Sequence, residues 1–65
     1  MPKYPKIKVK LIGQDGNAFF MIGRTSAALR RGGVDRAETD VFAEEATSGD
    51  YNHVITTIRR WVSVS

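Results

Sequence analysis

The amino-acid sequence predicts a small α+β domain in which an antiparallel β-hairpin packs against two to three short helices, in the order ββααα(β). Two patterns support this prediction. Lysine and aliphatic residues alternate strictly over residues 6–11, and an Asp15-Gly16 turn separates them from the apolar run 18–22. Beyond Gly23 the apolar residues recur at helical spacing. The hairpin is therefore expected first and the helices after it.

The Asp15-Gly16 turn also predicts the register of the hairpin, because a two-residue loop determines which residues face each other. One face is expected to be apolar and covered by the helices, whereas the other combines lysines with further apolar side chains. The expected pairs are Gly13 with Ala18, Leu11 with Phe20 and Val9 with Ile22 on the inner face, and Ile12 with Phe19 and Lys10 with Met21 on the outer face.

The first helix is expected over residues 27–31. Thr25 or Ser26 can cap its N-terminus through a side-chain hydroxyl. The pair Gly32-Gly33 is typical of a helix end, because glycine readily adopts the left-handed conformation found there.

Two further helices and a last strand follow. Asp35 and Glu38 have the spacing of a capping box and predict a helix that runs to roughly Thr47. Asp50 or Ser48 can cap a third helix with very regular apolar spacing. Its apolar residues are Tyr51, Val54, Ile55, Ile58 and Val62. Residues 61–65 alternate again and predict a short third strand beside the hairpin.

The length of the chain, 65 residues, leaves room for one domain. We expect it over residues 6–65, after a flexible lead-in at residues 1–5 that contains Pro2 and Pro5 and delays strand pairing until Lys6. A chain this short buries only about 60% of its unfolded surface, which argues against a deep enzymatic cleft. Its 42% hydrophobic and 26% charged residues favour a folded domain over a disordered one.

The sequence shows no apparatus for catalysis. It has no cysteine, a single histidine and no phosphate-binding glycine-rich loop, so we expect no enzyme activity, no metal, no cofactor and no small-molecule substrate. The polar cluster of Asp50, Tyr51 and His53 could transfer protons, yet a helix cap needs the same residue types. No signal-peptide stretch and no apolar run of about 20 residues occurs, so we expect a cytoplasmic protein without a membrane partner.

Charge is unevenly distributed along the chain. The net charge is +3, but residues 1–36 carry eight lysines or arginines and two acidic residues, which gives +6. Residues 37–65 carry two arginines and five acidic residues, which gives −3. Either the two halves of the chain attract each other, or the basic half binds an acidic partner.

The first functional hypothesis is a non-enzymatic protein-interaction module that binds another protein or a second copy of itself. One sheet face and three helices can bury only one apolar face of the hairpin, and contiguous exposed apolar surface usually marks an interface. The partner-binding residues in this hypothesis are Lys8, Lys10, Ile12, Phe19 and Met21.

The alternative hypothesis is a nucleic-acid-binding protein. Lysines at every second position of a strand project from one face about 7 Å apart, near the spacing of backbone phosphates, and aromatic surface lies beside them. Lysines on an exposed strand also prevent edge-to-edge aggregation, so the pattern alone does not distinguish nucleic-acid binding from protection of the strand edge. The residues in this hypothesis are Lys6, Lys8, Lys10, Arg24, Arg30 and Arg31.

Four segments further suggest a family. They are Gly16-Asn17-Ala18-Phe19, Ala28-Leu29-Arg30-Arg31-Gly32-Gly33-Val34, Glu45-Ala46-Thr47-Ser48-Gly49-Asp50-Tyr51 and Arg60-Trp61-Val62. Through them the chain resembles a set of small uncharacterised proteins of bacteria and of their phages and mobile elements, over most of its length from Lys6 onward. The resemblance implies a compact stand-alone domain with an accessory role. It implies no activity and no site residue.

Overall fold

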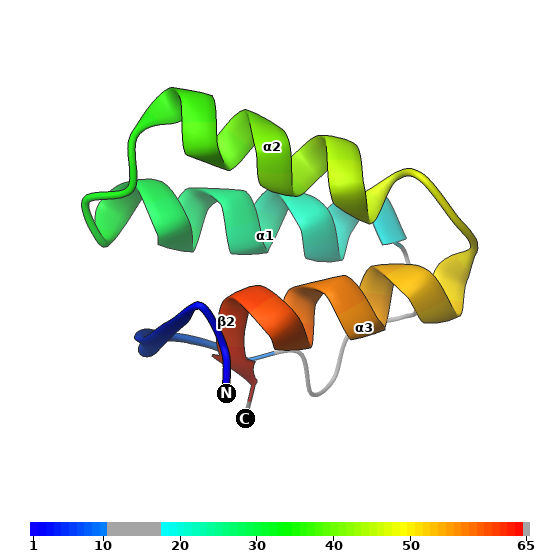
Figure 1. Ribbon diagram of the computed structural model, residues 1–65, viewed down its shortest axis with the longest axis horizontal. Coiled ribbons are helices and arrows are strands. Elements are labelled where there is room, and N and C mark those ends of the chain that lie inside the picture. The colour runs from blue at the N-terminus through cyan, green and yellow to red at the C-terminus, as the bar shows by residue number, and fades with distance from the viewer. Residues whose placement is uncertain (11–17, 65) are drawn as a thin grey trace.

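A computed structural model describes residues 1–10 and 18–64 (Figure 1). The elements are β1 (Tyr4–Val9), α1 (Ala18–Arg31), α2 (Arg36–Ala46), α3 (Tyr51–Trp61) and β2 (Val62–Val64). In Figure 1 α1 lies between α2 and α3, and every pair of these helices is in contact. Both strands lie at the C-terminal end of α3, and the N-terminal residues lie near β2.

The sheet consists of β1 and β2, which run parallel. Tyr4 is opposite Val62 and Val9 is opposite Val64. The register shifts between Tyr4 and Lys8, and the hydroxyl of Ser63 donates to the carbonyl oxygen of Pro5 within that irregular stretch, at 2.8 Å. Parallel strands cannot be joined by a tight turn. The connection between β1 and β2 accordingly contains all three helices.

The predicted antiparallel hairpin is therefore wrong. Residues 18–22, expected to form its second strand, begin helix α1 instead. A short apolar run cannot be assigned to a strand or a helix from periodicity alone, and here the helical spacing of buried Met21, Thr25 and Leu29 prevails. Val9, expected opposite Ile22, pairs with Val64. The pairs that involve residues 11–13 lie outside the described residues.

Helix α1 starts well before the predicted residue 27 but ends where the glycine pair indicates. Thr25, a predicted cap, lies in the helix interior and donates its hydroxyl to the carbonyl of Met21 at 2.9 Å. Gly33 has a φ of +94°, the left-handed region that favours glycine. The amide of Val34 then reaches back to the carbonyl of Leu29 at 3.0 Å. This backbone bond closes the helix in the way that the glycine pair predicts.

Helices α2 and α3 confirm the capping signals. A carboxylate oxygen of Asp35 accepts from the amide of Glu38 at 2.9 Å, and one of Asp50 accepts from the amide of His53 at 3.0 Å. The expected C-terminal strand is present at Val62–Val64, although it pairs with β1 alone. Strand β1 begins at Tyr4 rather than at Lys6.

The core lies where the helices meet the sheet. Phe42 of α2 and Ile58 of α3 are completely buried, and the Phe42 ring packs edge-on against Trp61 at a centroid distance of 5.4 Å. Burying one such side chain contributes about 1.5 to 3 kcal/mol relative to leaving it in water. The buried apolar residues are Val9, Met21, Ile22, Leu29, Phe42, Ala46, Val54, Ile58, Trp61 and Val62.

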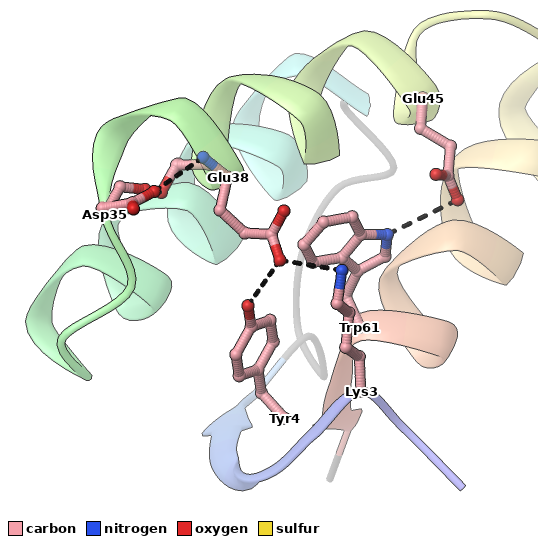
Figure 2. Close-up of polar contacts among 7 residues, drawn as sticks. Lys3, Tyr4, Asp35, Glu38, Glu45 and Trp61 are labelled. Atoms are coloured by element: carbon pink, nitrogen blue, oxygen red, sulfur yellow. Dashed lines mark hydrogen bonds and ion pairs between the residues drawn. The ribbon is translucent and has the colours of Figure 1, made fainter.

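An N-terminal clamp, formed by Lys3, Tyr4, Glu38 and Trp61, joins the start of the chain to the helices (Figure 2). The Lys3 ammonium lies 2.8 Å from Oε2 of Glu38, and the Tyr4 hydroxyl donates to the same oxygen at 2.7 Å. The Tyr4 ring stacks on Trp61 with centroids 5.9 Å apart, and the Lys3 ammonium lies 4.5 Å from the Trp61 ring centroid. Residues before and within β1 are thus held against α2 and α3.

Replacing Glu38 with glutamine tests the clamp through pH. Hydrogen bonds from Lys3 and then from Tyr4 hold the pKa of the Glu38 carboxyl below its ordinary value of 4.5. Such a carboxyl adds stability above its unfolded-state pKa and loses that contribution as the pH falls through its folded-state pKa. We expect Glu38→Gln to lower the free energy of unfolding at neutral pH and to have no effect well below the lowered pKa. Urea unfolding at a series of pH values from neutral to acidic measures the free energy of unfolding under both conditions.

Stability at alkaline pH and a matched control variant complete this test. The bond to Glu38 raises the pKa of Lys3 and of Tyr4, so the clamp also weakens as the pH rises through their folded-state values, beyond 10.5 and 10.0 respectively. Glu44→Gln removes an exposed carboxylate from the same helix and should show neither pH dependence. A Glu38→Gln effect of equal size at acidic and neutral pH would contradict the clamp.

Candidate functional site

An open groove of about 640 Å³ lies between the end of β1 and α1. We call it the β1–α1 groove. Its described lining residues are Lys8, Val9, Lys10, Phe19, Phe20, Gly23, Arg24, Ala27, Ala28 and Arg31. Four of these ten residues are basic and two are phenylalanines, and none of the described lining residues is acidic.

The groove follows from the residue spacing on α1. Positions 19, 23, 27 and 31 lie four residues apart, as do 20, 24 and 28, so they follow one side of the helix. Gly23, Ala27 and Ala28 are small residues in the middle of this side, beside Arg24, and a Cβ atom placed on Gly23 would have nothing within 4 Å. Larger side chains stand at the two ends: the phenylalanines in the first turn and Arg31 in the last. The pattern leaves a hollow between them.

Arg24 connects the helix wall of the groove to the strand wall. Its Nη1 atom donates to the carbonyl oxygen of Lys10 at 3.1 Å. The central carbon of its guanidinium lies 5.7 Å from the centroid of the Phe20 ring, within the range of a cation–π contact. A guanidinium carries five N–H donors, and within the described part of the chain the bond to Lys10 leaves donors for an anionic ligand.

The partner-binding residues predicted from the sequence are only partly brought together. Lys8, Lys10 and Phe19 line the β1–α1 groove, and Phe19 is 81% exposed. Met21 is only 2% exposed, so its predicted role as an exposed anchor is wrong. Phe19 and Met21 are two positions apart in the sequence. Residues with this spacing are separated by about 200° around the axis of an α-helix, whereas in a strand they would share a face. Ile12 lies outside the described residues.

The nucleic-acid-binding residues predicted from the sequence converge better. Lys8, Lys10, Arg24 and Arg31 all line the groove. Lys6 instead borders a separate hollow beside Ile7. Arg30 is exposed but does not line the groove.

Sequence reasoning missed Phe20 as a groove residue. The hairpin register placed it on the inner face opposite Leu11, yet it is 52% exposed and lines the groove. Its spacing of four residues from Arg24 was the available signal, because residues at i and i+4 are neighbours on a helix.

The polar cluster around His53 has the geometry of a helix cap. The Nε2 atom of His53 lies 2.8 Å from the carbonyl oxygen of Glu45 and 3.1 Å from the hydroxyl of Ser48. A carbonyl oxygen only accepts, so Nε2 is the donor in the contact with Glu45. A Cβ atom on Gly49 would lie 2.8 Å from Cβ and Cγ of His53, so glycine permits this close packing. The cluster joins α2 to α3.

Across residues 1–10 and 18–64, no group of three or more histidine, cysteine, aspartate or glutamate side chains is placed to hold a metal ion. None of the described helices has the length and apolar character needed to cross a membrane.

Comparison of the chain with protein-family models, with curated protein sequences and with solved structures gave no match. The resemblance to small bacterial and phage proteins stays a prediction.

Proposed function

We propose that this protein is a non-enzymatic binding module that holds nucleic acid in the β1–α1 groove. The observation that carries the proposal is the convergence of four basic and two aromatic side chains on one open groove whose described lining has no acidic residue. Basic side chains bind backbone phosphates, and aromatic rings bind bases. A groove of this composition offers both kinds of contact within one site.

The distribution of acidic residues also supports a polyanionic ligand. Glu38, Asp40, Glu44 and Glu45 all lie on α2, and α2 contributes no described residue to the groove lining. A phosphate backbone that approaches the groove therefore meets positive side chains, and none of the described residues on its walls carries a carboxylate. Such charge separation attracts an anionic chain and orients the protein during encounter.

The shape of the site favours a macromolecule over a small metabolite. Pockets for small molecules usually enclose most of the ligand and are lined mainly by apolar side chains. The β1–α1 groove is open, and its walls carry Lys8, Lys10, Arg24 and Arg31. Side chains of this kind suit repeated contacts to an extended anionic polymer.

The proposal predicts strongly salt-dependent binding of nucleic acid. We expect a labelled mixed-sequence oligonucleotide of about 12 nucleotides to bind at low salt, as measured by fluorescence anisotropy. With four phosphate contacts, a plot of log affinity against log salt should have a slope of about −3. The double variant Lys8→Ala, Lys10→Ala should weaken binding and bring this slope to roughly half.

The double variant Arg59→Ala, Arg60→Ala is the matched control for this experiment. It removes two positive charges from exposed positions on α3 that do not line the groove, so it should leave the slope unchanged. Absence of binding to both DNA and RNA at low salt would overturn the proposal. An equal loss of affinity in the groove variant and the control variant would mean that net charge, and not the groove, determines binding.

Self-association is a second candidate function, and a separate hollow favours it. A hollow of about 220 Å³ between α1 and α3 is lined by apolar residues that include Ile22 and Val54. Phe19 and Tyr51 stand at this hollow and are 81% and 46% exposed. Exposed apolar surface of this kind is common at protein interfaces.

Light scattering of the free protein tests self-association. A second copy docked at the hollow would give twice the mass of the 7.2-kDa chain, and Tyr51→Lys would return the protein to a monomer. The mass of the dimer should not depend on salt, because the contact is apolar. A monomer at every concentration would remove this second candidate and leave the groove as the working surface.

A further inference from the structure

We infer that the β1–α1 groove binds single-stranded rather than duplex nucleic acid, with Phe19 as the side chain on which a base stacks. This inference rests on the proposed function and adds the class of nucleic acid and the residue that recognises it.

The exposure of Phe19 is the first step. Its side chain is 81% exposed at the start of α1, where it adds nothing to the buried core. A polar residue at this helix position would avoid the unfavourable hydration of an exposed ring. Phe19 lines the groove beside the basic side chains, so its ring stands where a ligand would pass. A base stacked on the ring would bury this exposed apolar surface.

The second step concerns which nucleic acid offers a base face. In a duplex the faces of the bases are stacked on one another, and only their edges and the phosphates are accessible. In a single strand the bases can turn outward and stack on aromatic side chains. The exposed ring of Phe19 therefore has a partner in a single strand and has none in an intact duplex.

The floor of the groove gives a third, independent argument. A helix that reads duplex DNA presents side chains that hydrogen-bond to base edges, most often arginine, lysine, asparagine or glutamine. The middle of the α1 wall carries Gly23, Ala27 and Ala28, which offer no side-chain hydrogen-bonding group, together with Arg24, whose guanidinium is bound to the carbonyl oxygen of Lys10 on the other wall. Apart from Arg24, base edges would find no side-chain donors or acceptors on this part of the helix. The floor is compatible with stacked bases and with little dependence on sequence.

Arg24 is suited to bind the backbone of the same strand. Its bond to the carbonyl of Lys10 holds the guanidinium between the two walls of the groove. Phosphate binding by the remaining N–H groups would place the backbone along the groove, with Arg31 further along the helix. Phe19 and Arg31 are 12 residues apart on α1, which corresponds to about 18 Å. This length matches about five nucleotides at a stacked spacing of about 3.4 Å.

The test compares strands and Phe19 variants in one anisotropy assay. We expect the single strand to bind more tightly than a duplex of the same sequence at the same salt. Phe19→Ala should weaken single-strand binding about 5- to 150-fold, the usual range for loss of one stacked base. Phe19→Trp should retain binding, whereas Phe19→Leu should lose it, because leucine keeps the apolar character and lacks a ring face.

Three controls separate stacking from other effects. Val41→Ala removes exposed apolar surface from α2, outside the groove lining, and should leave affinity unchanged. The salt slope should be the same for Phe19→Ala as for the unaltered protein, since no phosphate contact is lost. Thermal unfolding should also be unchanged, because the Phe19 side chain is not part of the core.

The outcomes distinguish this inference from the proposed function. Equal affinity for duplex and single strand, or full binding by Phe19→Leu, would overturn single-strand stacking while nucleic-acid binding itself stood. Absence of binding to either form at low salt would overturn both. Tighter binding of the single strand together with loss only in the variants without a ring supports both.

Discussion

The parallel pairing of β1 with β2 is the constraint on which the rest of the structure depends. It joins residues near the two ends of the chain, with Val9 opposite Val64, and the connection between the strands must therefore contain all three helices. β2 follows α3 directly, since Trp61 ends the helix and Val62 begins the strand. The position of β1 beside α1, and with it the strand wall of the β1–α1 groove, depends on this pairing.

The N-terminal clamp supports the pairing of β1 with β2 by holding the start of β1 against α2 and α3. Trp61 packs on Phe42 in the core and on Tyr4 in β1, so one indole links two helices and the first strand. Glu38 then binds both Lys3 and Tyr4 through one carboxylate oxygen. A two-stranded sheet is marginal by itself, and these contacts from α2 and α3 supply cover that the strands lack.

Local signals in the sequence predicted local structure, and the long-range pairing lay beyond them. Asp35 and Asp50 were recognisable as caps because a cap involves residues only a few positions apart. The partner of β1 lies more than 50 residues away in the sequence, and the alternation that predicts the last strand does not show which strand it pairs with or in which direction. The apolar run 18–22 fitted both a strand and a helix, so the nearby turn signal led to the wrong choice. Phe19 and Met21 consequently fell on one predicted face and lie on different sides of α1.

The candidate site was predictable in its strand half and not in its helix half. Lys8 and Lys10 were expected to be exposed from strand alternation, and both line the groove. Phe20 and the small residues Gly23, Ala27 and Ala28 line the groove because of their spacing on a helix. The predicted hairpin placed Phe20 in a strand, so this spacing was not recognised. The fold also brings basic side chains of β1 and α1 together in a groove to whose lining the acidic helix α2 contributes no described residue. Counting charges along the sequence shows only two unequal halves.

The central claim is that the groove between β1 and α1 is the surface that binds nucleic acid. The most direct measurement is an NMR titration of the isotopically labelled protein with a short single-stranded oligonucleotide, in which backbone amide shifts are followed residue by residue. If the groove binds the strand, the largest shifts lie at residues 8–10 and along 19–31, while α2 and most of α3 stay unchanged. Shifts centred on α2 or α3, or no shifts at low salt, would contradict it.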